Sequence, residues 1–391
     1  MKIVAIGGAG AVGTAALRAV MAMSGSHEIV VADRNPDAAR TCARRLDAAP
    51  LTVDATDSRT LRAALDDADI VLNTAGPFYR LGPLVLRAAI DTRTHYLDVC
   101  DDWEPTLGML EFDAMAKESG ITAVLGMGAS PGLSNLMAAQ GAAELDTVDQ
   151  LYTVWPVDPP GYVAEDAAEL LTAADGRPSA AALHWLQQLS GTILVVRGGR
   201  RVTQRPMHPI RLRLPGRRSG TVYTVGHPEP ITLACTVAPG ADIACAMLLK
   251  RSTVAFLDDL RNRIDKGHST IEEAATRLIR PGLLMMARAV LRAPAWPGPG
   301  NLPPFFAVAC GTTAGAPSTV VVTPHRSLHG LFGDMARATG IPLALGAAQV
   351  CGGAARTPGV HPPEAIIDRK AFFAAFAQYC GGERSVTVAR G

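Results

Sequence analysis

The sequence opens with an apolar run, a group of glycines and a helix-prone stretch, and this succession constrains the fold more than any other feature. Residues 2–7 (KIVAIG) predict a strand, and residues 11–23 (AVGTAALRAVMAM) predict a helix. Gly8, Gly10 and Gly13 follow the strand with the spacing G-x-G-x-x-G. Because glycine is unfavourable inside regular structure, this turn indicates that something must approach the backbone closely.

A second apolar run, residues 28–33 (EIVVAD), ends at Asp33, where a Rossmann unit places an acid for the ribose hydroxyls of a dinucleotide. In this interpretation Gly8 allows the tight turn, Gly10 admits the pyrophosphate and Gly13 lets the helix pack on the strand. The N–H groups at the start of the helix, at Ala11 and Val12, are expected to bind phosphate. Asp33 favours NAD because it repels a 2′-phosphate, whereas the neighbouring Arg34 favours NADP. We expect NAD as the cofactor, with NADP as the alternative.

Strand and helix patterns continue to alternate up to residue 127. Strands are expected at 51–54, 69–75, 94–99 and 121–127, and helices at 35–46, 57–68, 82–92 and 111–120. This alternation predicts an α/β fold with an N-terminal Rossmann-type, doubly wound parallel sheet, which binds ligands beyond the carboxyl ends of its strands. The further cofactor-binding residues expected at these ends are Asp54, Ala55, Asn73, Thr74, Ala75, Gly76 and Pro77.

The pattern changes after residue 130, where a second, mixed α+β domain is expected. Its predicted strands are residues 148–156, 193–197, 208–214 and 221–225. Its predicted helices are residues 164–174, 179–191 and 269–291, and two more helices are expected at 333–350 and 364–378. A nucleotide domain followed by such a domain is typical of dehydrogenases that bind a cofactor and a second substrate.

Four segments carry a family resemblance. They are NTAGPFYRLGPLVLRAAIDTRTHYLDV (73–99), GMGASPGLSNLMA (126–138), GHPEP (226–230) and GVHPPEAIIDRKAFFAAF (359–376). In order and spacing they resemble the saccharopine dehydrogenase-like family, whereas residues 235–320 match it poorly. The resemblance implies a soluble NAD(P)-dependent oxidoreductase that transfers hydride at a C–N bond, amine or imine, of an amino-acid-like substrate.

Two other functions remain open because of the divergent middle region: a nucleotide-binding scaffold or sensor without turnover, and a C–O or C=C reductase of secondary metabolism. The resemblance and the apolar run AFFAAFAQ near the end also predict the domain organisation. We expect a Rossmann domain at 1–130, a substrate and dimerisation domain at 131–350, and a C-terminal segment at 351–391 that returns to the Rossmann domain.

Candidate catalytic residues cluster after the expected strand at 94–99. Alternation places Tyr96 and Asp98 on one strand face, and Asp101 and Asp102 follow in the loop. A carboxylate here is suited to holding an ammonium or iminium group and moving a proton on nitrogen. Tyr79 is expected to lie where the substrate meets the nicotinamide. The alternative is that Asp98 holds a loop and Tyr79 is an ordinary surface residue.

An amino-acid substrate also needs a cation for its carboxylate, and a bidentate arginine suits this best. The candidates are Arg80, Arg197, Arg200 and Arg201, although a solvated strand edge explains the last three equally well.

The composition argues against several other functions. The net charge is +1, so there is no excess of basic residues that would indicate binding to nucleic acid or to a membrane surface. No apolar stretch is long enough to span a bilayer. The seven cysteines form no CxxC pair and the nine histidines no HExxH motif, so we expect reduced thiols in the cytoplasm and no metal. The expected partners are a small-molecule amine, amino acid or keto acid and a second copy in a homodimer.

Overall fold

The computed structural model describes residues 1–23, 27–158, 171–172, 176–325, 331, 333–380, 382 and 384–391. The helix expected at 164–174 lies almost entirely outside these residues. The chain divides into two compact units. The first unit comprises residues 1–136 and the described residues between 326 and 385. The second unit comprises the described residues between 137 and 325, with residues 386–391.

The first unit is built on a seven-stranded sheet with the order β15-β6-β5-β4-β1-β2-β3, in which every pair is parallel. The strands are β1 (Lys2–Ile6), β2 (Glu28–Asp33), β3 (Ala49–Thr52), β4 (Ile70–Asn73), β5 (His95–Asp98), β6 (Thr122–Val124) and β15 (Gly359–His361). Ile6 pairs with Ala32 on one side and with Asn73 on the other. The glycine turn, Asp33 and Asn73 therefore lie at one edge of the sheet. The predicted doubly wound α/β fold is confirmed.

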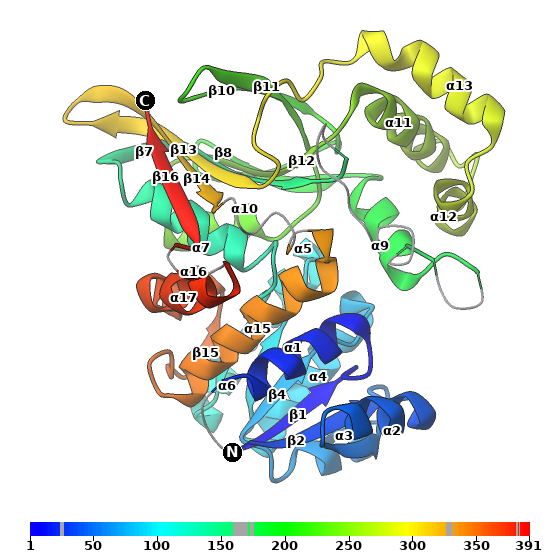
Figure 1. The fold of residues 1–391 in the computed structure, drawn as a ribbon, viewed down its shortest axis with the longest axis vertical. Coiled ribbons are helices and arrows are strands. Elements are labelled where there is room, and N and C mark those ends of the chain that lie inside the picture. Colours follow the sequence, from blue (N-terminus) through cyan, green and yellow to red (C-terminus); the bar gives the residue numbers. More distant parts are fainter. Residues whose placement is uncertain are drawn as a thin grey trace. The chain divides into compact units, whose positions relative to one another are not determined.

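Helices cover both faces of this sheet, as continuous apolar strands require. They are α1 (Ala11–Met21), α2 (Pro36–Arg45), α3 (Ser58–Leu65), α4 (Phe78–Thr92), α5 (Trp103–Leu110), α6 (Asp113–Ser119), α15 (Met335–Cys351), α16 (Pro363–Ile366) and α17 (Arg369–Phe376). Figure 1 shows α1 in blue and α15 in orange side by side. A Cβ at Gly340 would lie 2.6 Å from the backbone nitrogen of Ala16, so α15 approaches α1 closely only because residue 340 is glycine.

Two elements of the first unit differ from the sequence prediction in ways that affect the site. Helix α4 begins at Phe78, four residues earlier than expected, so Tyr79 and Arg80 lie on its first turn and not in a loop. Strand β6 ends at Val124, because the chain turns at Gly126, which has a φ of 74°.

The second unit contains a mixed sheet with the order β10-β11-β12-β7-β13-β14-β16, and β8 also pairs with β12 while β9 pairs with β8. Its strands are β7 (Thr147–Pro156), β8 (Ile193–Arg197), β9 (Arg200–Gln204), β10 (Pro209–Leu214), β11 (Arg218–Thr224), β12 (Asp242–Leu248), β13 (Phe306–Thr313), β14 (Ala316–Pro324) and β16 (Val386–Arg390). Only the β7–β12 pairing is parallel among the pairings described. The four strands predicted here are present, whereas β12 and β13 were not predicted.

The helices of the second unit are α9 (Ala180–Gln188), α10 (Glu229–Thr236), α11 (Arg251–Asp265), α12 (Ile271–Ile279) and α13 (Leu283–Arg292). Helix α7 (Leu133–Ala142) runs across the division between the units. The single helix expected at 269–291 is two helices, because Pro281 and Gly282 interrupt it. Side chains of β12 alternate between two apolar clusters: Ala244 belongs to one, and Cys245 belongs to the other, which packs under α9, α11 and α12.

The C-terminal region is shared between the two sheets. Strand β15 pairs with β6 in the first sheet, and β16 pairs with β14 in the second. The division differs from the predicted boundaries in two places. Helix α15, which the prediction placed in the middle domain, packs on α1, and residues 386–391 lie in the second unit.

Candidate functional site

The glycine turn between β1 and α1 is shaped by two glycines before the helix begins. Gly7 has a φ of 73°, and a Cβ at this position would lie 2.9 Å from the backbone nitrogen of Ala75. A Cβ at Gly8 would lie 2.8 Å from the carbonyl oxygen of Ala5. The left-handed residue of the tight turn is therefore Gly7, and glycine is also needed at position 8 because the preceding strand approaches it closely.

Gly10 and Gly13 differ in what surrounds them. Gly10 is the N-cap residue of α1, and a Cβ there would meet only the carbonyl oxygen of Gly7, at 3.2 Å. A Cβ at Gly13 would lie 2.7 Å from the Gly7 oxygen and 2.8 Å from the Thr74 hydroxyl. The helix thus packs on the turn at Gly13, while Gly10 leaves open space in front of the first N–H groups of α1, at Ala11 and Val12. Such an opening suits a phosphate group.

Asp33 ends β2, beside this turn. Its carboxylate accepts a hydrogen bond from the backbone N–H of Asn35 at 3.0 Å, and Asn35 in turn caps helix α2. Asp33 is partly exposed and Arg34 is exposed. Both residues lie where the ribose of a dinucleotide is expected.

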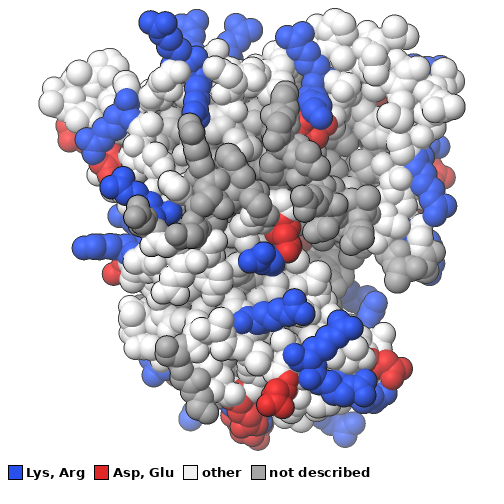
Figure 2. Space-filling model, viewed as in Figure 1, with Lys and Arg blue, Asp and Glu red and all other residues white. Residues whose placement is uncertain are grey.

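Asp54 follows β3 at the same edge, next to the buried Ala55. The backbone N–H and the hydroxyl of Thr56 donate to Asp54 at 2.8 and 2.7 Å. These hydrogen bonds lower the pKa of Asp54, and the positive charges of Arg34 and Arg80 lower it further. Arg34 and Arg80 therefore both interact electrostatically with Asp54. On the face drawn in Figure 2, Lys and Arg side chains lie over the region of α1 and α2, with Asp and Glu side chains beside them.

A chain of buried polar groups links β4 and β5. Asn73 Nδ2 donates to the Tyr96 hydroxyl at 3.1 Å, and the Tyr96 hydroxyl donates to Asp98 Oδ2 at 2.8 Å. Asn73 Oδ1 also accepts from the backbone N–H of Ala75 at 3.1 Å, which fixes the turn of Thr74 to Pro77. Asn73, Tyr96 and Asp98 are all fully buried. The predicted pairing of Tyr96 with Asp98 on one strand face is present.

The second carboxylate oxygen of Asp98 holds two loops together. It accepts from the backbone N–H groups of Gly126 at 2.6 Å and Cys100 at 3.1 Å. Burial raises the pKa of Asp98 to about 6, although these hydrogen bonds oppose the rise. Burial also raises the pKa of Tyr96 well above its usual value, and Asp98 adds to this. The carboxylate of Asp98 thus connects the segment after β5 to the segment after β6.

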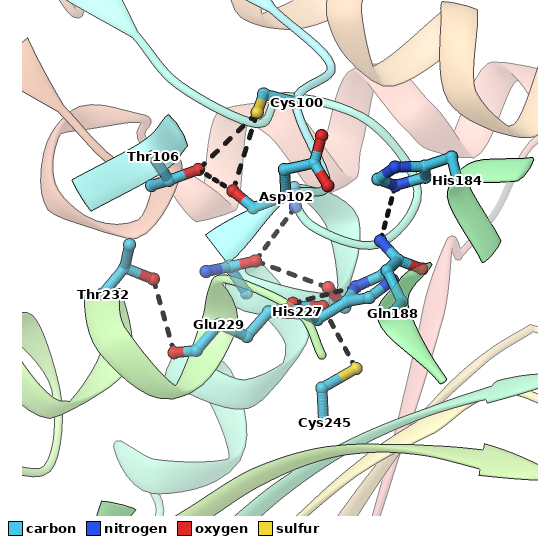
Figure 3. Close-up of polar contacts among 12 residues, drawn as sticks. Cys100, Asp102, Thr106, His184, Gln188, His227, Glu229, Thr232 and Cys245 are labelled. Carbon is cyan, nitrogen blue, oxygen red and sulfur yellow. Dashed lines mark hydrogen bonds and ion pairs between the residues drawn. The ribbon is translucent and has the colours of Figure 1, made fainter. Parts of the chain in front are cut away.

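The remaining predicted residues of this edge are more accessible. Asp101 and Asp102 are partly exposed, and Asp102 is the N-cap residue of α5. Figure 3 shows Cys100 and Thr106 turned toward the carbonyl oxygen of Asp102, which accepts from Thr106 at 2.7 Å. Tyr79 is 56% exposed on the first turn of α4, and Arg80 beside it is also exposed.

Asn135 and Glu364 form a contact that the sequence prediction did not assign to the site. Asn135 Oδ1 accepts from the backbone N–H of Gly132, and its Nδ2 donates to Glu364 at 2.9 Å. Both are buried or partly buried in the first unit, and they join the turn after β6 to α16. The segment SPGLSN was the only signal for Asn135, and nothing local in the sequence connects it to Glu364.

The three predicted substrate arginines of the second unit lie on the β8–β9 hairpin. Arg197 lies 3.8 Å from Asp242 in an ion pair and also donates to Gln204. Arg200 and Arg201 are exposed, and Arg201 donates to the sulfur of Cys235 at 3.7 Å. Arg197 is therefore held by the hairpin and by β12, while Arg200 and Arg201 extend from its edge. None of the helices in the described part of the chain is both long enough and apolar enough to cross a bilayer.

The first unit matches a known family of domains. Residues 3–124 match the model of the saccharopine dehydrogenase NADP binding domain. This stretch contains the whole succession from β1 to β6, with the glycine turn, Asp33 and the chain from Asn73 to Asp98.

The whole chain resembles two solved structures. Saccharopine dehydrogenase (L-Glu forming) from Saccharomyces cerevisiae, without ligand, matches with a TM-score of 0.63 and 15% identity, over 100% of this chain and 99% of that chain. The homospermidine synthase from Legionella pneumophila, in complex with NAD, matches with a TM-score of 0.59 and 12% identity, over 99% and 91%. At these identities the likeness establishes the fold. The chain thus shares the fold of these two structures along its whole length, and its first unit contains an NAD(P)-binding domain of the saccharopine dehydrogenase type at residues 3–124.

Proposed function

We propose that the protein is an oxidoreductase that uses NAD(P) to transfer hydride at a C–N bond of an amino-acid-like substrate. The observation that carries this proposal is the match of the whole fold to saccharopine dehydrogenase together with the NADP binding domain match at residues 3–124. When bound, the nicotinamide supplies or accepts the hydride. Amine oxidation then leaves a C=N⁺ group, which water converts to a carbonyl and a free amine; reduction runs the same steps in reverse.

The residues of the first unit have distinct roles in this proposal. The open side of Gly10 and the N–H groups of Ala11 and Val12 bind the pyrophosphate, and Asp33 binds the ribose hydroxyls and favours NAD. The turn from Asn73 to Pro77 lies against the nicotinamide end. Its shape is set by Asn73, which is locked between Tyr96 and the N–H of Ala75.

Tyr96 and Asp98 are positioning residues in this proposal, because their side chains are fully buried and contact each other and the backbone. They hold the loop that presents Asp101 and Asp102. These two partly exposed carboxylates stabilise a cationic amine or iminium, and one of them moves the proton on nitrogen. Tyr79 lines the same edge, and Arg80, Arg197, Arg200 and Arg201 are the candidates for binding the substrate carboxylate.

The decisive experiment is a substrate panel followed by NAD(P)H absorbance and fluorescence. Secondary amines formed from amino acids and keto acids should support reduction of NAD⁺ or NADP⁺, whereas alcohols should not. Cofactor binding without turnover of any amine, carbonyl or alkene would instead identify a scaffold or sensor, and turnover of a carbonyl or alkene alone would place the reaction at C–O or C=C. Light scattering on the same sample tests the expected homodimer.

A further inference from the structure

Three potential metal ligands meet inside the second unit. His227 follows β11, Glu229 is the first residue of α10, and Cys245 lies in the middle of β12. Their exposed fractions are 3%, 0% and 0%, and Figure 3 shows the three side chains turned toward one another. All three residues belong to the second unit.

Neighbouring elements fix the position of each side chain. The backbone N–H of Val225 donates to the carbonyl oxygen of Cys245 at 3.1 Å, which brings the chain after β11 alongside β12. The ring of Trp155 lies 5.7 Å from that of His227, measured between centroids. Thr153 pairs with Cys245 across the β7–β12 ladder. Cys245 thus lies on a strand and Glu229 at a helix start, and His227 lies in the short segment that joins β11 to α10.

The distances match those around a small tetrahedral ion. His227 Nδ1 lies 3.2 Å from Glu229 Oε2, and Cys245 Sγ lies 3.7 Å from Glu229 Oε1. All three donor atoms lie within 4.8 Å of one another. Zinc binds nitrogen, oxygen and sulfur at about 2.0–2.3 Å, which places neighbouring ligand atoms about 3.3–3.6 Å apart at a tetrahedral centre. The two separations from Glu229, one to each of its carboxylate oxygens, differ from these edges by only a few tenths of an ångström.

The electrostatics of the cluster also suit a cation. A divalent ion bound to a thiolate, a carboxylate and a neutral imidazole is electrically balanced, as a buried group of charges must be.

We propose that His227, Glu229 and Cys245 bind one divalent transition-metal ion of the zinc class. A sulfur, an imidazole nitrogen and one carboxylate oxygen select zinc or cobalt over magnesium and calcium, which require oxygen ligands. Three protein ligands leave a fourth coordination position for water. No metal was predicted from the sequence because it contains no CxxC or HExxH motif. The three ligands come from segments that are separate in the sequence.

Cobalt provides the direct test, because thiolate coordination to Co²⁺ produces a sulfur-to-metal absorption band in the near ultraviolet and d–d bands in the visible. The full-length protein is stripped with a chelator, dialysed and titrated with CoCl₂ and then ZnCl₂. We expect one equivalent of cobalt, tetrahedral d–d bands, and loss of the spectrum when one equivalent of zinc is added. Metal content after gel filtration, measured by mass spectrometry, should be one zinc per chain.

Matched variants locate the site. Cys245→Ser should abolish the sulfur-to-cobalt band, and His227→Gln should weaken cobalt binding at least tenfold. Cys235→Ser, at the exposed cysteine of the same unit, should leave both unchanged. The proposal is overturned if the folded wild-type protein takes up no cobalt with a sulfur band, or if Cys245→Ser keeps that band. Because the readout is independent of NAD(P)H, its failure is distinct from failure of the proposed function.

Discussion

The Tyr96 hydroxyl donates to Asp98 Oδ2 over 2.8 Å in an interior where both side chains are fully buried. Asn73 donates to the same hydroxyl from the neighbouring strand, and the backbone of Gly126 and Cys100 donates to the other oxygen of Asp98. Water cannot replace a lost hydrogen-bond partner in this interior. The loss of one group in this series of hydrogen bonds therefore leaves its neighbours without a partner.

Tyr96→Phe removes one hydroxyl from the middle of the chain. Asn73 Nδ2 and Asp98 Oδ2 then each lose a buried partner, which should lower the free energy of unfolding by about 1–3 kcal/mol. Urea denaturation followed by circular dichroism measures this change. Tyr79→Phe is the matched control, because Tyr79 is 56% exposed, and it should leave stability unchanged. Equal stability of the two variants would show that the Tyr96 hydroxyl is not needed.

The raised pKa of Asp98, about 6 against an ordinary 3.8, gives stability a definite dependence on pH. Between pH 3.8 and pH 6, Asp98 is protonated in the folded protein but ionised in the unfolded chain. The contribution of this proton to the free energy of unfolding is therefore fully present below pH 3.8. It is lost as the pH rises to 6, and the total loss is about 3 kcal/mol. Unfolding of wild type and Asp98→Asn should be compared at half-unit steps from pH 3.5 to 7. The difference between their free energies of unfolding should change in this window, and a constant difference would contradict the assignment.

Gly10→Val tests the phosphate-binding turn. The added Cβ meets only the Gly7 oxygen at 3.2 Å, so the fold should remain, while the side chain fills the space in front of α1. We expect at least a tenfold loss of affinity for both NADH and NADPH, measured by fluorescence titration, with little change in Tm. Gly108→Ala in α5 is the control, because a Cβ there has no neighbour within 4 Å. Unchanged affinity in Gly10→Val would remove the turn from the cofactor site.

Asp33→Ser tests cofactor preference. Loss of the carboxylate removes hydrogen bonds to the ribose hydroxyls and the repulsion of a 2′-phosphate, and Arg34 remains available to bind that phosphate. The ratio of the NADH and NADPH dissociation constants should shift toward NADPH by about tenfold, which corresponds to about 1.4 kcal/mol. Asp37→Ser, on the exposed first turn of α2, should leave the ratio unchanged. A wild-type protein that already prefers NADPH tenfold would show that Arg34 determines the choice.

Asp101→Asn and Asp102→Asn test the proposed contact with a cationic substrate. A charge-assisted hydrogen bond contributes about 1.5–3 kcal/mol, so losing it should lower kcat/KM at least tenfold, and further if the group moves a proton. Single-turnover kinetics across pH measure both effects. Asp66→Asn, at the C-cap of α3, serves as the control. Wild-type rates and pH profiles in both loop variants would exclude these two acids from the reaction.

Most elements of the first 124 residues could be predicted from the sequence, because the strands are apolar and most helices begin near a turn residue, but helix α5 was not predicted. The glycine spacing predicted the turn before α1 and the packing at Gly13. It did not show that Gly7 adopts the left-handed conformation, since that depends on how close Ala75 lies to the turn. The pairing of Tyr96 with Asp98 followed from alternation, but their complete burial depends on helices that pack over the strand.

Tertiary contacts explain most of what the sequence did not reveal. Strand β12 (DIACAML) is rich in alanine and lacks the β-branched pattern of a typical strand. Asn135 and Glu364 are 229 positions apart, so their contact appears only in the folded chain. The same holds for His227 and Cys245, which come together because the chain after β11 runs beside β12.

The close contact between Gly340 and Ala16 has a consequence for how the protein can be divided. Helix α15 covers the alanine-rich side of α1, yet the two are separated in sequence by the entire second unit. A fragment ending near residue 130 contains every glycine of the nucleotide turn but leaves that side of α1 exposed to water. The cofactor-binding unit is thus an interrupted domain, with the second unit inserted between its two halves. An independently folding version must rejoin residues 1–136 to the segment that contains α15, β15 and α17.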